Sequence, residues 1–207
     1  MRLRAANTDR ALGAVIGTEA TMREQRWETA RLYIRPWEPA TEVMIAHEIY
    51  GDPAVMQYIR DPSADLAATA QTLQKYRDHY TQPQLGTGVW AVVEKVAGIP
   101  IGSVLLVQLP LSEGYEELPE SPEFEMGWHF RRDRWGQSYA REAASCILNY
   151  GVQELGLSKI YAVIREGNWR SQRLAKGLGM QPQGKTSKYY NTELLLFEYC
   201  GECCAES

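Results

Sequence analysis

Residues 124–155 constrain the fold most, because a strand pattern there passes through one glycine into a helix pattern. The segment "FEMGWHFR" alternates as a strand does, and "RRDRWGQSYARE" follows at residues 131–142 with the single glycine Gly136. From Ser138 to Leu155, apolar or small residues return every three or four positions, which predicts an amphipathic helix packed on a sheet. Strand, turn and helix together predict an α/β fold.

Five further strands and four further helices are predicted around this unit. Alternating or β-branched runs place strands at residues 30–37, 89–95, 99–109, 159–164 and 188–199. Three- and four-residue spacing, with glycine and proline as breakers, places helices at residues 39–52, 52–59, 63–80 and 168–180. The predicted order is strand, helices, hairpin, strand, helix, strand, helix, strand.

The length of 207 residues allows one sizeable core and is short for two. We therefore predict one domain at residues 27–200, with tails at residues 1–26 and 201–207. Residues 1–26 carry charges of both signs and show no sustained helix or strand periodicity. We interpret them as a tail, which an artefactual extension of the sequence would explain. Apolar content of 44% is ordinary for a globular protein, and no apolar run is long enough for a membrane span.

The four cysteines indicate a reducing cytoplasm rather than a secreted, disulfide-stabilised protein. Cys146 lies in a helical pattern, and the other three crowd the C-terminus in "CGECC". A closed zinc site needs four ligands, and the sequence has no second cluster with matching spacing, so no metal is predicted. The net charge of −4 and the lack of an extended basic stripe argue against nucleic acid as a partner.

The glycine turn predicts an anion site. Backbone amides at a helix N-terminus have no intrahelical acceptor and lie at the positive end of the helix dipole. The free donors would be those of Gln137, Ser138, Tyr139 and Ala140, and the implied ligand is a polyphosphate. Three arginines before the glycine add positive charge: Arg131, Arg132 and Arg134. The spacing is neither a P-loop nor a three-glycine dinucleotide turn, and a plain chain turn with solvated arginines remains an alternative.

The segment "FEMGWHFRRDRWGQSYAREA" resembles the acyl-CoA-binding segment of the GCN-related N-acetyltransferase (GNAT) superfamily, and more narrowly its RimJ/RimL-like branch. The matching positions are Glu125, Gly127, Trp128, Trp135, Gly136, Tyr139, Ala140, Glu142 and Ala143. "ETARLYIRPW" and "GNWRSQRLAKGLGM" resemble the family's first strand and last helix, so the resemblance runs from about residue 27 to residue 199. It implies a single domain with a mixed, mostly antiparallel sheet of about six or seven strands and helices on both faces.

Four positions depart from the family pattern. Ser138 replaces the usual second glycine, Asp133 stands where many relatives have Gln or Arg, and Met180 replaces an aromatic residue. Ala175 occupies the position at which many relatives have a tyrosine general acid. The serine hydroxymethyl could narrow the approach to a pyrophosphate, although its hydroxyl could also donate a hydrogen bond.

The resemblance implies acetyl-CoA as the donor, with its pyrophosphate on the turn and its pantetheine along the preceding strand. The residues expected to bind it are Trp128, Phe130, Arg131, Trp135, Gly136, Gln137, Ser138, Tyr139, Ala140 and Asn168. For Asn168, capping of the last helix alone would be a sufficient explanation.

Catalysis is assigned to Glu125 as the base and to Ser171 as a hydrogen-bond donor to the leaving thiolate. A solvated or ion-paired strand glutamate and an ordinary first-turn serine remain the plain alternatives for these residues. Neutralising a lysine amine at pH 7 costs about 4.6 kcal/mol, and an α-amine about 1 kcal/mol. One modest carboxylate base therefore fits an α-amine best. His129 is left out, because its position in the alternation sets it opposite Trp128 and Phe130.

The predicted function is transfer of an acetyl group from acetyl-CoA to a primary amine by direct attack, with a protein or peptide N-terminus slightly favoured. Aminoglycoside, polyamine or amino-acid acetylation is an alternative, and the glutamate-rich segment at residues 113–123, most simply a solvated loop, could attract a cationic acceptor. A non-catalytic acyl-CoA-binding module is an alternative of another class. We expect a cytoplasmic monomer or homodimer.

Overall fold

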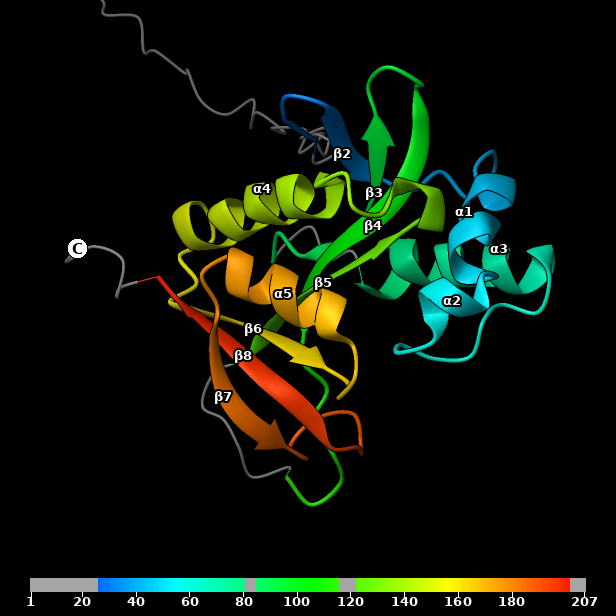
Figure 1. Cartoon of the computed structure of the whole chain (residues 1–207). Coiled ribbons are helices and arrows are strands. Elements are labelled where there is room, and N and C mark those ends of the chain that lie inside the picture. The colour runs from blue at the N-terminus through cyan, green and yellow to red at the C-terminus, as the bar shows by residue number, and fades with distance from the viewer. Residues whose placement is uncertain (1–25, 81–84, 116–121, 202–207) are drawn as a thin grey trace, which may run out of the picture.

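The computed structural model describes residues 26–80, 85–115 and 122–201 (Figure 1). The two predicted tails therefore lie almost wholly outside the described residues, as does the middle of the glutamate-rich segment. The described residues form one sheet with helices on both of its faces.

The sheet has eight strands in the order β1-β2-β3-β4-β5-β6-β8-β7. Their bounds are β1 Trp27–Glu28, β2 Leu32–Pro36, β3 Gly88–Glu94, β4 Ile99–Gln108, β5 Phe124–Phe130, β6 Lys159–Ile164, β7 Gln181–Thr186 and β8 Leu194–Cys200. Every neighbouring pair is antiparallel except β5 and β6, which are parallel. The α/β class and the mixed, mostly antiparallel sheet are confirmed, with a higher strand count than the expected six or seven.

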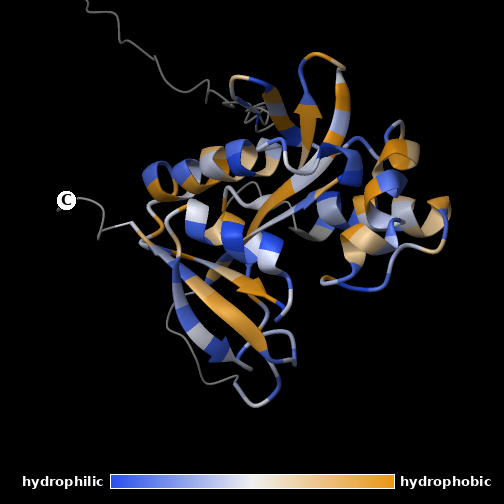
Figure 2. Cartoon of the chain, viewed as in Figure 1, coloured by the Kyte–Doolittle hydropathy of each residue, from blue (hydrophilic) through white to orange (hydrophobic). Residues whose placement is uncertain are grey.

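The extra strands lie at the two ends of the sheet, where sequence patterns are weakest. β1 has only two residues, and β7 consists of polar or small residues and one proline. Figure 2 shows the contrast between the hydrophilic β7 and the apolar β8 beside it. An exposed polar edge strand discourages pairing with other chains, and the same polarity hides it from a search for apolar alternation.

The helices divide between the two faces of the sheet (Figure 1). Their bounds are α1 Val43–Tyr50, α2 Pro53–Met56, α3 Leu66–Lys75, α4 Tyr139–Gln153 and α5 Trp169–Gly177, with a π-helical turn at Tyr76–Tyr80 and a 3-10 turn at Arg132–Arg134. On β3, Trp90 and Val92 pack toward α4, whereas Val89, Ala91 and Val93 pack toward α1 and α3. A strand covered on both faces is apolar throughout, which explains the run "VWAVV".

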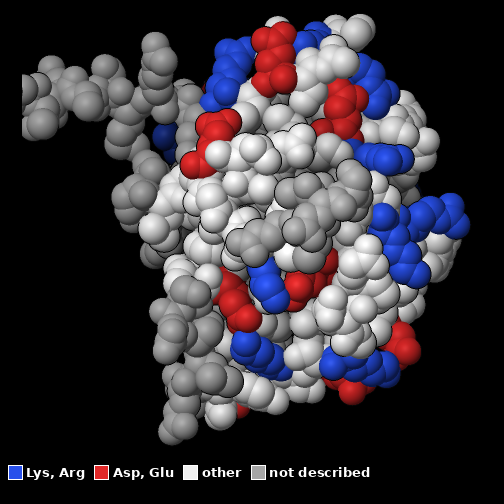
Figure 3. All heavy atoms as spheres, turned by 90° about the vertical axis from the view of Figure 1, so that its left-hand side faces the viewer, with Lys and Arg blue, Asp and Glu red and all other residues white. Residues whose placement is uncertain are grey.

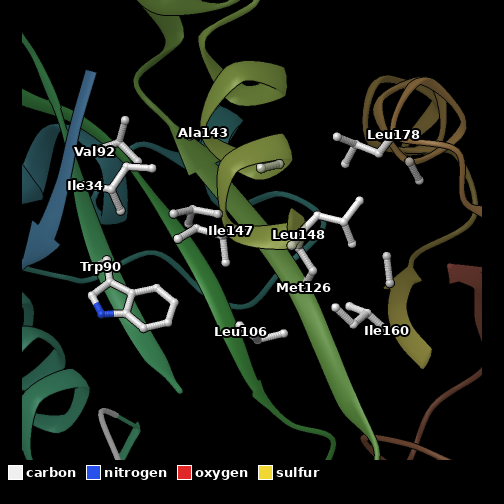
Figure 4. Close-up of a cluster of buried hydrophobic side chains, with 14 of the residues drawn as sticks. Ile34, Trp90, Val92, Leu106, Met126, Ala143, Ile147, Leu148, Ile160 and Leu178 are labelled. Atoms are coloured by element: carbon white, nitrogen blue, oxygen red, sulfur yellow. The ribbon is translucent and has the colours of Figure 1, made fainter. Parts of the chain in front are cut away.

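Helix α4 makes the larger core with the sheet (Figure 4). Its Ile147 and Leu148 point toward Leu106 of β4 and Met126 of β5. A Cβ atom at Gly151 would come within 2.7 Å of Ile160 Cδ1, so glycine at this position allows close approach of α4 to the sheet. This packing holds the N-terminus of α4 at the end of β5.

Charged side chains of both signs mingle on the face drawn in Figure 3, with no broad area of one sign. Among the described residues, no helix combines the length and the apolar character that crossing a membrane requires.

The first turn of α4 is tied to the β1–β2 turn by one carboxylate, that of Glu142. Its Oε1 accepts hydrogen bonds from Thr29 Oγ1 at 2.6 Å and from the Arg31 amide at 2.8 Å, and its Oε2 lies 2.7 Å from Arg31 Nε. Desolvation raises the pKa of Glu142, but these bonds outweigh it and the pKa is lowered. Ionised Glu142 therefore stabilises the fold.

We predict that Glu142→Gln lowers the free energy of unfolding at pH 7 by about 2 kcal/mol, because charge-assisted bonds at a partly buried site are lost. Since the folded-state pKa lies below the unfolded value, the contribution is present above the unfolded pKa and disappears as the pH falls through the folded one. Urea denaturation from pH 7 to pH 3 would measure it. Glu154→Gln, an exposed position beyond the end of the same helix, is the control. Equal losses in both variants would contradict the assignment.

Candidate functional site

The site is built around a split in the sheet between β5 and β6. These strands share a single register pair, Glu125 with Tyr161. Beyond it, residues 126–130 of β5 pair with β4 on one side and with no strand on the other, within the described residues. Buried backbone donors and acceptors require partners, so this open strand edge is suited to an extended ligand.

The turn after β5 has an unusual backbone. Gly136 has φ +74°, and Ser138, the residue before α4, has φ +64°. Open space surrounds the position that a Cβ of Gly136 would take. Ser138 makes no side-chain capping bond to α4, and a left-handed backbone costs a residue with a Cβ roughly 1–2 kcal/mol. The serine that replaces the family's glycine therefore adopts the glycine-like conformation at some expense of stability.

The amides predicted to bind an anion are available. Within the described residues, the N–H groups of Gln137, Ser138, Tyr139 and Ala140 donate to no other group. Arg31 Nη1 donates to the carbonyl oxygen of Gln137 at 3.0 Å. Because N–H and C=O of one trans peptide point in opposite directions, the Ser138 amide is directed away from Arg31. The turn is thus held with its donors free, as the predicted polyphosphate site requires.

The three arginines of the turn are not equivalent. Arg131 and Arg134 both contact Asp133, at 3.2 and 2.7 Å, and each has a second carboxylate partner, on α1 and on β3. Arg132 is 66% exposed and has one long contact of 3.5 Å with the carboxylate before α2. Asp133, which departs from the family pattern, therefore neutralises two of the arginines. Arg132 is the most open positive charge of the three.

Several of the predicted cofactor-binding side chains have structural roles here. Phe130 lies in the core, and its carbonyl accepts a hydrogen bond from Trp135 Nε1 at 2.8 Å. The hydroxyl of buried Tyr139 donates to Glu94 on β3. The Arg131 amide donates to the carbonyl of Ile101 at 2.9 Å and is not free for a ligand. Phe130 and Tyr139 therefore support the turn from the core side, and the Tyr139 amide has no acceptor within the described residues.

Trp128, Ser171 and Asn168 lie together on the face of the sheet that α5 covers. Trp128 Nε1 donates to Ser171 Oγ at 3.3 Å. Asn168 Oδ1 accepts from the Ser171 amide at 3.3 Å and so caps α5. Ser171 Oγ accepts one bond and keeps its own proton to donate. Nearby, the Arg170 guanidinium stacks over the Trp135 ring at 4.6 Å, which joins α5 to the turn.

Glu125 lies on the opposite face of β5. Phe124, Met126 and Phe130 all point into the core under α4, and the alternation of a strand turns Glu125 the other way. Its carboxylate is partly buried, and Oε1 accepts a hydrogen bond from the Tyr190 hydroxyl. Desolvation raises the pKa of Glu125 to about 7, while the bond from Tyr190 acts in the lowering direction. A carboxyl group with this pKa is half ionised at neutral pH.

Tyr190 contacts the candidate base but was not predicted from the sequence. Residues 188–199 were predicted as one strand, but β8 begins only at Leu194. Tyr190 and Asn191 both have left-handed backbones, with φ of 60° and 51°, and belong to the loop between β7 and β8. Asparagine is the residue other than glycine that most readily takes this conformation, so Asn191 and the polar Thr192 were the available signal.

A pocket of about 460 Å³ lies between the end of α2 and the end of β6. Arg60, Asp61 and Arg165 contribute its charged side chains. The charge of Arg60 acts on His129, and the strand alternation sets His129 on the Glu125 face of β5. The pocket therefore opens on the same side of the split as the carboxylate, with an excess of positive charge.

His129 of β5 lies near Arg60, which lines this pocket. Burial, with a contribution from the charge of Arg60, lowers the pKa of His129 to about 4, so the ring is neutral at pH 7. Among the described residues, no three side chains of His, Cys, Asp or Glu are grouped to hold a metal ion. Ala175, the position of the family's tyrosine, is fully buried.

Comparison with known proteins identifies the family. Residues 31–181 match the model of the acetyltransferase (GNAT) domain. The uncharacterized protein YkkB of Bacillus subtilis is 28% identical over 171 residues, which is 82% of this chain and 92% of that protein. The crystal structure of a GNAT-family acetyltransferase from Bacillus anthracis superimposes with a TM-score of 0.69 at 23% identity, over 86% of this chain and 99% of that one.

A putative ribosomal-protein-serine acetyltransferase from Vibrio cholerae has the same fold, with a TM-score of 0.65 at 17% identity over 85% of this chain and 97% of that one. The family match spans the split between β5 and β6, the glycine turn, α4 and α5. The chain therefore belongs to the GNAT family and is an N-acetyltransferase.

Proposed function

We propose that this protein transfers the acetyl group of acetyl-CoA to a primary amine, with the α-amine of a peptide or protein favoured, as in the RimJ/RimL-like branch. The observation that carries the proposal is Glu125, whose carboxyl group has a pKa of about 7 beside the split in the sheet. Membership of the GNAT family implies the use of acetyl-CoA. The similarity to the putative ribosomal-protein-serine acetyltransferase from Vibrio cholerae supports the choice of branch.

The donor fits the groups that the chain leaves free. The amides from Gln137 to Ala140 would hold the diphosphate, with Arg132 as the most exposed of the three arginines of the turn. The unpaired edge of β5 beyond Glu125 would hold the pantetheine arm through backbone hydrogen bonds. Bound in this way, acetyl-CoA supplies the thioester that the amine attacks.

In the proposed reaction the amine nitrogen attacks the thioester carbonyl, so that a C–N bond forms and the C–S bond breaks. Glu125 takes the proton from the amine, and the sulfur leaves as a thiolate. A base with a pKa of about 7 matches an α-amine, whose neutralisation at pH 7 costs about 1 kcal/mol, far better than a lysine at about 4.6 kcal/mol. This difference favours a chain terminus as the acceptor.

Ser171 would act from the other face of the sheet. Glu125 and Ser171 lie on opposite faces beside the same split, so both can reach an atom held between the strands. The serine hydroxyl would donate a hydrogen bond to the thiolate. A thiolate is a weak base, so a hydrogen bond can replace the protonation that a tyrosine supplies in many relatives.

The pocket lined by Arg60, Asp61 and Arg165 favours a peptide over a polycation as the acceptor. Within the described part of the chain, neither Arg60 nor Arg165 forms an ion pair with a carboxylate, and Asp61 offsets only one of their charges. A polyamine or an aminoglycoside would be repelled by the remaining positive charge. A peptide with acidic residues after its N-terminus would be attracted.

Glu125→Gln should lower kcat at pH 7.5 by about 100-fold and change the dissociation constant of acetyl-CoA by less than about twofold, because the variant loses the base and keeps the turn. Release of free thiol with a peptide bearing a free α-amine measures turnover, and calorimetry measures binding. For the parent, kcat/KM should rise with pH through about 7, as the carboxyl group ionises. If the kcat/KM of Glu125→Gln has the same pH profile as that of the parent, Glu125 is not the base.

Gly136→Val should weaken acetyl-CoA binding at least about tenfold in calorimetry, because a β-branched residue disfavours the φ of +74° and the turn must move its amides. Gly156→Val is the matched control, since Gly156 has φ +67° and equally open surroundings but lies beyond the far end of α4. The control should lose similar stability and keep its affinity. Equal affinities of the two variants would contradict the binding role of the turn.

Arg165→Glu should reverse the preference between two peptides that differ only in acidic or basic residues after the N-terminal alanine. We expect the KM of the acidic peptide to rise about tenfold, with the KM of acetyl-CoA unchanged. Lys75→Glu, an exposed lysine on α3, carries the same change of charge as a control. A rise in the KM of acetyl-CoA alone would assign the pocket to the donor instead.

A further inference from the structure

The loop between β7 and β8 carries backbone strain, most of it at Tyr190. Tyr190 and Asn191 are consecutive residues with left-handed φ values, and among the described non-glycine residues only Ser138 shares this conformation. Each such residue costs roughly 1–2 kcal/mol, less for asparagine. Strain of this kind persists only where surrounding contacts over-determine the backbone.

Contacts with the β4–β5 connection hold the loop from one side. The Ser112 amide donates to the Lys188 carbonyl at 2.8 Å, and Ser112 Oγ accepts from the Asn191 amide at 2.8 Å. The Asn191 side chain accepts from the Glu113 amide at 2.8 Å. These bonds cross between segments about 80 residues apart in the sequence, so tertiary structure fixes the loop.

A second anchor lies at the start of β5. Glu123 Oε2 accepts from the hydroxyl of Tyr189 at 2.7 Å and from Lys188 Nζ at 2.6 Å. Tyr189 is 1% exposed, so its ring and its hydroxyl are both fixed. Glu123 precedes Glu125 by two residues, which places the anchor on the same side of the chain as the carboxylate of the site.

The anchors determine where the next side chain goes. Tyr190 is 44% exposed, so burial of its ring does not set its position, yet its hydroxyl donates to Glu125 Oε1. We propose that Tyr190 is a positioning residue for acetyl transfer, which the strained β7–β8 loop holds so that it fixes Glu125 Oε1 and leaves Oε2 for the amine. The inference rests on the proposed base role of Glu125 and deepens it.

The hydrogen bond has a definite effect on protonation. Tyr190 donates to the ionised form of Glu125. This bond lowers the pKa of the carboxyl group and so opposes the increase in pKa that desolvation causes. In the reaction, the amine proton passes to Oε2, and Tyr190 keeps its own proton throughout. Without the donor, the carboxyl group would ionise at higher pH, and less of the base would be available at pH 7.

The test is Tyr190→Phe, with Tyr115→Phe as the control. Tyr115 is an exposed tyrosine in the β4–β5 connection, and its hydroxyl has no hydrogen bond within the described residues. Carbon-13 NMR of protein labelled at the glutamate carboxyl carbon follows the titration of Glu125, with Glu125→Gln assigning the resonance. We expect the pKa of Glu125 to rise by about one pH unit in Tyr190→Phe, the size of one hydrogen bond, and to stay constant in the control.

In Tyr190→Phe, the pH at which kcat/KM rises should increase by the same amount. This lowers kcat/KM at pH 7 about fivefold, with the affinity for acetyl-CoA unchanged. An unaltered titration in Tyr190→Phe would overturn the inference. A shifted titration with an unshifted kcat/KM profile would confirm the contact but remove Glu125, and with it Tyr190, from the reaction. That result would count against the proposed mechanism rather than against the geometry.

Asn191→Ala tests the loop separately, because it removes the bond to the Glu113 amide without touching Glu125. The carboxyl titration should shift in the same direction by a smaller amount. No shift would overturn the part assigned to the loop.

Discussion

The divergence of β5 and β6 after one shared pair is the constraint on which the site depends. Backbone groups in a sheet interior normally satisfy one another, and here one strand edge is left without a strand partner within the described residues. The surrounding fold keeps the opening in place, because α4 fastens β5 to the sheet core and α5 packs beside β6. Side chains from both faces of the sheet can then reach a ligand in the split, Glu125 from one face and Ser171 from the other.

Among the described non-glycine residues, backbone strain is concentrated at the candidate site. The non-glycine residues with left-handed backbones in the described chain are Ser138, at the turn, and Tyr190 and Asn191, beside Glu125. Each is held by contacts that reach across the fold, such as Arg31 to the Gln137 carbonyl and Asn191 to the Glu113 amide. Packing in the hydrophobic cores on the two faces of the sheet offsets the free-energy cost of these conformations.

The sequence patterns predicted the secondary structure correctly where the periodicity of apolar residues was strong. The α/β class, the strand–turn–helix unit at residues 124–155 and the cap at Asn168 all follow from local chemistry, and the structure agrees with them. The predictions were weaker at the sheet edge and in the last strand. β7 lacks apolar alternation, and residues 188–193 look β-prone but form a loop. Their conformation comes from Ser112, Glu113 and Glu123, which no local window contains.

The sequence by itself determined the α/β class, the strand–turn–helix unit at residues 124–155 and Glu125 as the candidate base, because each depends on residues close together in the chain. Only the tertiary structure decided that Asp133 neutralises two arginines, that Phe130 and Tyr139 support the turn from the core side, and that Tyr190 reaches Glu125. The physical reason is that protonation and charge balance depend on burial and on partners, and folding brings those partners from distant segments.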